Sequence, residues 1–119
     1  MRRDIKIANI LGEKYSIEYR VLKEDKKLEE LAGYTDFYSK EIVIEDSERS
    51  ERSITSTSNL KEYENKVLKH EIIHAYLYES GLDVNSSRAY AWATNEEMID
   101  WFAIQSSKIY KTYEELGIL

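Results

Sequence analysis

Residues 59–81 read NLKEYENKVLKHEIIHAYLYESG, and this stretch decides how the rest of the chain is organised. Asn59 followed three residues later by Glu62 is typical of a helix start, because each side chain can bond to a backbone N–H of the first turn. Gly81 is typical of the residue just after a helix end. We therefore predict a single helix over residues 60–80, about 30 Å long.

This helix contains His70-Glu71-Ile72-Ile73-His74, with the only two histidines of the chain. Helical residues four apart share a face and have Cβ atoms about 5–6 Å apart, so two imidazoles can bind one ion. Zinc accepts neutral imidazole at about 2.0–2.1 Å. Glu71 lies about 100° around the helix, which keeps it out of the ligand set but near a water on the metal. That is the place of a general base, and the spacing is typical of zinc-dependent hydrolases.

A catalytic zinc ion needs a third protein ligand and keeps its fourth position for water. The chain has no cysteine and no further histidine, so the third ligand must be a carboxylate. Thr94 with Glu97 repeats the capping signature and predicts a second helix, whose first residues include Glu96 and Asp100. Because these two are four residues apart, one carboxylate can bind the ion while the other accepts a hydrogen bond from a ligating imidazole.

The two motifs together, His70-Glu71-x-x-His74 and, 22 residues after His74, Asn95-Glu96-x-x-x-Asp100, resemble those of the gluzincin zinc metallopeptidases. The small size of the chain is similar to the minimal single-domain gluzincins and to the ImmA/IrrE-type peptidases of phages and mobile elements. Phe102-Ala103 is also similar to the latter. The motif-bearing resemblance covers about residues 59–107. It implies a zincin-like α+β fold, in which a small twisted antiparallel or mixed sheet packs on the motif helix and a second, glutamate-bearing helix.

The resemblance also implies a role for each motif residue. His70, His74 and Glu96 would bind one zinc ion, Glu71 would be the catalytic general base and acid, and Asp100 would orient His70. The implied activity is hydrolysis of a peptide bond by a metal-activated water, with a peptide or a regulatory protein as substrate.

Two further features of the family have less direct counterparts in this chain. Many gluzincins place a histidine or tyrosine beside the developing oxyanion. Here Tyr90, Tyr110 and Tyr113 are candidates by position only. The resemblance also implies that an edge strand near residues 42–45 aligns an extended substrate by backbone pairing.

The residues before the motif helix predict a small sheet. Apolar positions 15, 17, 19 and 21 alternate with polar ones, and Gly12 suggests a hairpin with a preceding strand near Ile5 and Ile7. Residues 42–44 predict another strand, paired with residues 34–38. A short helix over residues 25–32 is expected to end at Gly33. The Ser/Thr-rich residues 47–58 are expected to form a mobile loop.

Composition limits the remaining possibilities. A chain of 119 residues allows one domain, residues 1–119, and its formal charge of −6 argues against nucleic acid as a partner. No apolar stretch approaches the length needed to span a membrane, and no leader pattern is visible. We therefore expect a cytoplasmic protein, and a monomer is favoured.

One competing interpretation is a non-catalytic, metal-stabilised binding or regulatory domain that retains the peptidase fold. A structural zinc site normally closes all four positions with protein ligands and has no use for Glu71, which favours the enzyme. The aromatic residues Trp92, Trp101 and Phe102 are expected to belong to the core.

Overall fold

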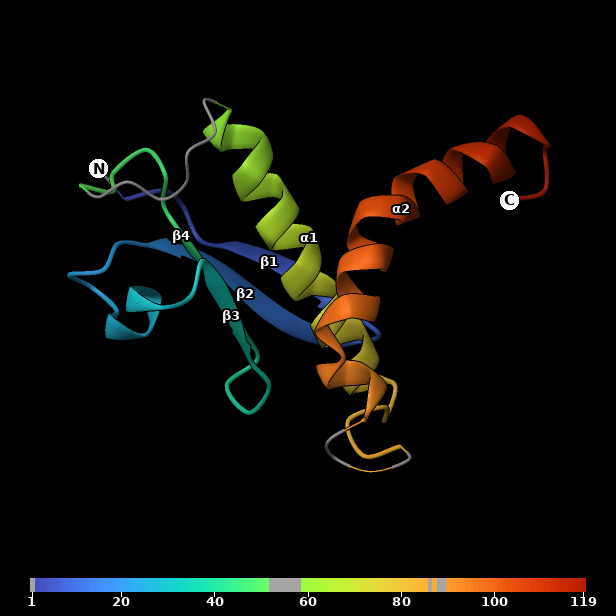
Figure 1. The fold of residues 1–119 in the computed structure, drawn as a ribbon, viewed down its shortest axis with the longest axis horizontal. Coiled ribbons are helices and arrows are strands. Elements are labelled where there is room, and N and C mark those ends of the chain that lie inside the picture. The colour runs from blue at the N-terminus through green and yellow to red at the C-terminus, as the bar shows by residue number, and fades with distance from the viewer. Residues whose placement is uncertain (1, 52–58, 86, 88–89) are drawn as a thin grey trace.

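The computed structural model describes residues 2–51, 59–85, 87 and 90–119. A four-stranded mixed sheet packs against two long helices, which confirms the predicted α+β class (Figure 1). The strands are β1 (Lys6–Ile10), β2 (Glu13–Arg20), β3 (Gly33–Asp36) and β4 (Glu41–Glu45). Their order across the sheet is β1-β2-β4-β3, with β2 and β4 parallel and the other two pairs antiparallel.

The predicted N-terminal hairpin is confirmed as the pair β1–β2. The chain reverses at Leu11 and Gly12, where φ is 52° and 90°, and glycine accepts a positive φ without strain. The Asn9 side chain accepts a hydrogen bond from the Gly12 N–H at 2.7 Å. The alternation along β2 is also confirmed, because the side chains of Tyr15, Ile17 and Tyr19 are all buried.

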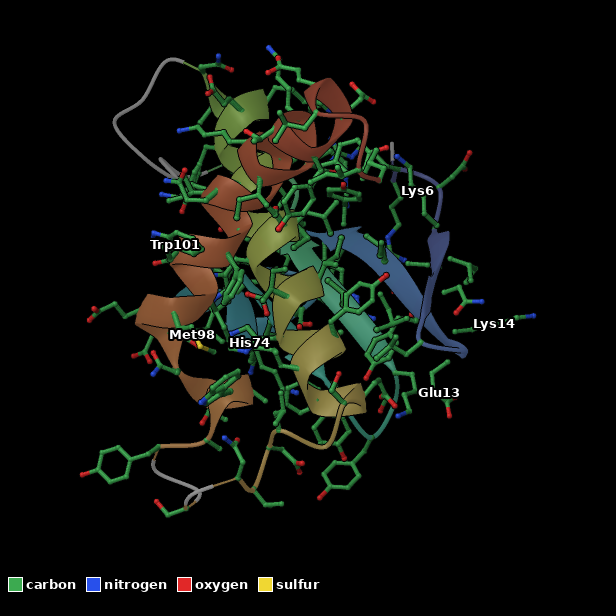
Figure 2. The ribbon with its side chains drawn as sticks, turned by 90° about the vertical axis from the view of Figure 1, so that its right-hand side faces the viewer. Lys6, Glu13, Lys14, His74, Met98 and Trp101 are labelled. Atoms are coloured by element: carbon green, nitrogen blue, oxygen red, sulfur yellow. The ribbon has the colours of Figure 1, made fainter. Side chains whose placement is uncertain are left out.

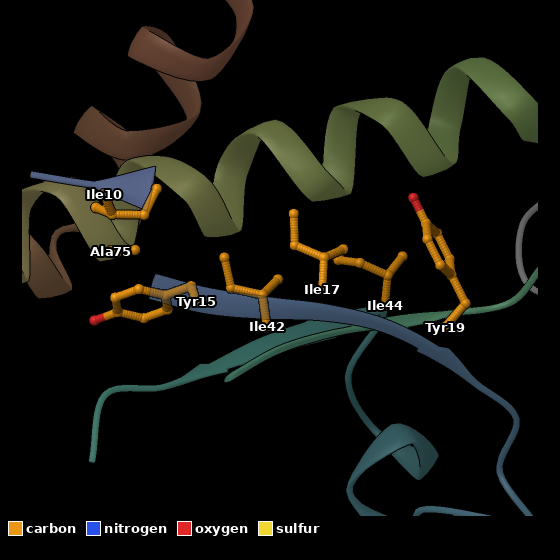
Figure 3. Close-up of a cluster of buried hydrophobic side chains, with 7 residues drawn as sticks. All are labelled: Ile10, Tyr15, Ile17, Tyr19, Ile42, Ile44 and Ala75. Carbon is orange, nitrogen blue, oxygen red and sulfur yellow. The ribbon is translucent and has the colours of Figure 1, made fainter. Parts of the chain in front are cut away.

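Helix α1 (Leu60–Glu79) lies across one face of the sheet and covers the core (Figures 1 and 3). Its predicted ends are confirmed: the Asn59 side chain accepts from the Glu62 N–H at 3.1 Å, and Gly81 follows with φ of 80°. Apolar side chains of the sheet face the helix, and their packing removes apolar surface of both elements from water. The core cluster is Ile10, Tyr15, Ile17, Tyr19, Ile42, Ile44 and Ala75.

Strand β4 is internal, so the expected edge strand near residues 42–45 is wrong. β4 is bonded to β2 on one side and to β3 on the other, and its backbone is not available to a substrate. Its three apolar residues Ile42, Val43 and Ile44 are at most 1% exposed, as in a strand buried on both faces. The edge of the sheet on this side is β3, which lies beside α1.

The segment before β3 also differs from the expectation. Only a 3-10 helix, η1 (Lys26–Glu29), forms there, with Asp25 accepting from the Lys27 N–H. Gly33 does not end a helix but begins β3. A Cβ atom at Gly33 would meet the Val43 carbonyl oxygen and Val67 Cγ1, each at 2.9 Å. Glycine is therefore needed here for the close approach of β3 to β4 and α1, not for a positive φ.

Helix α2 (Glu96–Glu115) follows a 3-10 turn, η2 (Trp92–Thr94). Its cap is Asn95, whose side chain accepts from the Met98 N–H at 3.0 Å, and not Thr94 as predicted. The residues after Lys108 continue the same helix. In the described chain α2 buries only Ile99 and Ala103, and its C-terminal half extends away from the sheet (Figure 1).

The predicted core position of three aromatic residues is wrong. Trp92, Trp101 and Phe102 are 48%, 53% and 38% exposed. The buried residues of α2 are spaced four apart, so the helix face with Ile99 and Ala103 packs inward and the neighbouring aromatics point elsewhere. The aromatic side chains therefore belong to the surface.

Residues 52–58 of the expected mobile loop lie outside the described residues. The loop begins at a fixed point, because both the N–H and the hydroxyl of Ser47 donate to Glu64 of α1, at 3.0 and 2.7 Å. In the described part of the chain, neither helix has the length and apolar character needed to cross a lipid bilayer.

Candidate metal centre

The two histidines of α1 face the start of α2. His70 and His74 lie one turn apart, and their Nε2 atoms approach to 3.1 Å. Glu96, the first residue of α2, brings Oε2 to 3.0 Å from His70 Nε2 and Oε1 to 2.8 Å from His74 Nε2. Figure 2 shows His74 between α1 and the first turns of α2, near Met98. The sequence motifs on the two helices are thus brought together.

The other nitrogen of each imidazole has a partner that fixes the ring. His74 Nδ1 lies 2.6 Å from the carbonyl oxygen of Ala93, which can only accept a hydrogen bond, so Nδ1 carries the proton. His70 Nδ1 lies 2.7 Å from Oδ1 of Asp100, and it donates to this carboxylate in the same way. Both Nε2 atoms are then unprotonated in the neutral rings and present lone pairs to each other.

In this tautomer, three lone-pair donors converge. The ligand atoms of His70, His74 and Glu96 all lie within 4.8 Å of one another. Four ligands at about 2.0–2.1 Å around a tetrahedral zinc ion would be about 3.3 Å apart, close to the 2.8–3.1 Å separations of the nearest atoms here. Two neutral nitrogens and one carboxylate oxygen are also a donor set that zinc accepts. The group can hold a divalent metal ion.

Glu71 lies next to this centre but is not one of the converging groups. Its residue is 7% exposed, and its carboxylate Oε1 accepts a hydrogen bond from the Thr35 hydroxyl at 2.9 Å. Burial raises the pKa of the Glu71 carboxyl above its ordinary value, while the hydrogen bond from Thr35 and the two imidazoles oppose the shift. A buried carboxylate with a raised pKa, beside a metal-ligand set, is suited to accept and return a proton.

Thr35 is a site residue that the sequence analysis missed. It lies in β3, and its hydroxyl is also 3.2 Å from the Glu71 carbonyl oxygen. Nothing in the local sequence identifies it, because its position depends on β3 being the strand beside α1.

A groove of about 1150 Å³ begins at the metal centre and passes along α1. His70 and Glu71 of α1 line this groove, as do Asp100 and Ile104 of α2. Residues 30–33, which precede and begin β3, complete this part of the lining. The groove leaves room beside the centre for a ligand of peptide size, and Gly33, the first residue of the edge strand β3, is part of its lining.

The tyrosines suggested as oxyanion partners gain no support from their positions. Tyr90 is 76% exposed and Tyr110 is 55% exposed. Tyr110 also lies 14 residues after Glu96 on the same helix, which separates them by about 21 Å along its axis. Tyr113 is one turn farther still.

The chain matches no protein-family model, and no curated protein or solved structure is significantly similar to it. The functional argument therefore depends on the geometry of the centre itself.

Proposed function

We propose that this protein is a zinc-dependent metallopeptidase of gluzincin type. The observation that carries the proposal is the convergence of His70, His74 and Glu96 beside the buried carboxylate of Glu71. A ligand set that served only to stabilise the fold would not need an acid held next to it in a shielded position.

Each residue then has a distinct task. The two histidines and Glu96 would hold the ion, with Asp100 and the Ala93 carbonyl keeping the imidazoles in the tautomer that binds metal. A bound zinc ion lowers the pKa of water and polarises a carbonyl group. Glu71 would take the proton of the attacking water and deliver it to the leaving amine, so no covalent intermediate is needed.

The free edge of strand β3 is consistent with the binding of an extended substrate in the groove. The Ala32 carbonyl accepts from the Glu45 N–H, which makes these two a hydrogen-bonded pair of the β3–β4 ladder. In an antiparallel ladder such pairs alternate, so the backbone groups of Gly33 and Thr35 point away from β4. They would pair with a substrate backbone next to Glu71, independent of its side chains.

The first test is the metal content of purified protein beside the variants His74→Ala and Glu96→Ala. We expect one zinc ion in the parent and loss of stoichiometric zinc in both variants, because two ligands do not hold the ion tightly. Stoichiometric zinc in both variants would refute the assigned ligands.

The second test separates an enzyme from a metal-stabilised binding domain. The binding domain is favoured by one observation: among the described residues of α2 only Ile99 and Ala103 are buried, and an ion between α1 and α2 would hold the two helices together. Glu71→Gln should keep zinc and abolish hydrolysis of a peptide library if the protein is a peptidase. A parent protein that binds zinc and is stabilised by it, but cleaves no peptide, would support the binding domain instead.

A further inference from the structure

The groove beside the metal centre is lined by three lysines, Lys66 and Lys69 of α1 and Lys108 of α2. Among the described residues, none of the three forms a salt bridge with an acidic side chain. Lys40, by contrast, binds Glu79 at 2.5 Å. The groove lysines are therefore free to bind a carboxylate supplied by a ligand.

Their positions place the positive charge close to the centre. Lys66 is one turn before His70 on the same face of α1, about 6 Å along the helix axis. Lys108 lies two turns beyond Asp100 on α2, about 12 Å along that helix. The two helices diverge in this direction (Figure 1), so the lysines line the widening part of the groove from two sides.

The acidic residues of the groove lie at the metal centre, at the N-terminus of α1 and before β3. Glu71, Glu96 and Asp100 lie at the metal centre, where the charge of a bound divalent ion would offset theirs in part. Of the other two acids in the lining, Glu62 lies one turn beyond Lys66, at the N-terminus of α1, and Glu30 precedes β3. Between Glu62 and His70 on α1, and after Asp100 on α2, the charged lining residues are Lys66, Lys69 and Lys108, on a chain whose formal charge is −6.

We infer that the groove selects peptides that carry a carboxylate within a few residues of the scissile bond, on the side that lies along the N-terminal half of α1. This inference rests on the proposed peptidase function. A carboxylate in the groove would be bound by Lys66 and Lys108, with Lys69 adding to the local potential, whereas the net negative charge elsewhere would repel it. The carboxylate belongs either to an Asp or Glu side chain or to the C-terminus of the substrate.

The test measures peptide binding to the Glu71→Gln protein by fluorescence anisotropy, with and without zinc, so that it does not depend on turnover. Three labelled peptides of one sequence are compared: one with an internal Glu and an amidated end, one with Gln and a free carboxyl end, and one with Gln and an amidated end. We expect one of the first two to bind about fivefold more tightly than the third, the upper range for exposed ion pairs. The one that does so identifies the source of the carboxylate.

Matched variants assign the preference to the groove. The double variant Lys66→Gln with Lys108→Gln should remove it, and high salt should weaken it by screening. Lys14→Gln is the control, because Lys14 is exposed near the start of β2, beside the β1–β2 turn, and Figure 2 shows it well away from His74. Equal binding of all three peptides, or a preference that survives in the double variant, would overturn the inference. Because these outcomes concern binding, they are distinct from a failure to hydrolyse peptides.

Discussion

The hydroxyl of Thr35 links a strand residue to a carboxylate on the neighbouring helix, and its contribution can be isolated. Thr35→Val removes the hydroxyl but keeps the shape, so Glu71 loses a hydrogen bond that fixes its orientation. Hydrogen bonds to charged groups contribute about 1.5–3 kcal/mol, and we expect kcat for peptide hydrolysis to fall by roughly 10- to 100-fold with little change in KM. Steady-state kinetics at matched zinc content would measure this.

Thr35→Ser is the control for this prediction, because it retains the hydroxyl and loses one methyl group. It should retain most of the kcat that Thr35→Val loses. If both variants are equally slow, Thr35 acts through packing rather than through its hydrogen bond, and the positioning role is wrong.

At the residue scale, the sequence predicted the three converging side chains and the contact of Asp100 with His70, but not the residue that supports Glu71. The spacing of His70 and His74 in a capped helix is enough to bring two imidazoles together, and a carboxylate was required by the lack of other ligands. The structure brings Glu96 to both rings. Thr35 could not be predicted, because its contact with Glu71 joins residues 36 apart in the sequence and depends on the order of the strands.

At the element scale, the start of α2 connects helix stability to the metal site. Asn95 caps the helix, and the next residue is Glu96, which we propose as a metal ligand. Asn95→Ala should lower the free energy of unfolding by about 1 kcal/mol and weaken zinc binding, because a frayed first turn no longer holds Glu96 in place. Asn95→Asp, which keeps a capping oxygen, should preserve both quantities. Urea denaturation and zinc titration measure the two effects.

The result that would contradict the prediction for Asn95 comes from Thr94, the residue before it. The Thr94 hydroxyl donates to the Ala91 carbonyl oxygen at 3.1 Å inside the 3-10 turn, so it does not cap α2. A larger loss of zinc affinity in Thr94→Ala than in Asn95→Ala would show that the turn, and not the cap, positions the ligand.

Helices and strands were predicted well where a single sequence pattern determines their bounds, and poorly where two patterns favour different bounds or different positions in the sheet. The alternation in β2 and the caps of α1 each have a single interpretation, and both are confirmed. Thr94 and Asn95 are both good capping residues, so the sequence leaves the start of α2 uncertain by one position. For residues 42–44, a continuous apolar run is typical of an internal strand, and that signal outweighs the charged residues at its ends.

At the scale of the whole molecule, the strand order was beyond the sequence analysis. β2 and β4 are parallel neighbours, although β3 lies between them in the sequence. Local patterns identify strands but do not give their order across the sheet, and the edge that was expected near residues 42–45 is formed by β3. The close packing that requires Gly33 follows from the same order.

The Glu79 carboxylate connects α1 to β2 and to the β3–β4 turn, and it makes the stability of the fold depend on pH. Glu79, at the end of α1, accepts hydrogen bonds from Tyr15 of β2 at 2.6 Å and from Lys40 of the β3–β4 turn at 2.5 Å. The hydrogen bond from Lys40, followed by that from Tyr15, lowers the pKa of Glu79 below its ordinary value of 4.5. The folded state therefore holds this group ionised at a pH where the unfolded chain would protonate it.

The sign of the effect follows from proton binding. Above pH 4.5 both states are ionised and the stabilisation by Glu79 is complete; as the pH falls from there through the lowered folded pKa, the unfolded state binds the proton first and the stabilisation is lost. We expect Glu79→Gln to be less stable than the parent by about 1 kcal/mol at neutral pH, with the difference shrinking at acid pH. Urea denaturation over a pH series measures both curves. The variant should retain some acid sensitivity, because the pKa values of Glu24 and Asp36 are also lowered, chiefly by hydrogen bonds. A constant difference between variant and parent across the acid range would mean that the carboxylate of Glu79 contributes no pH-dependent stability.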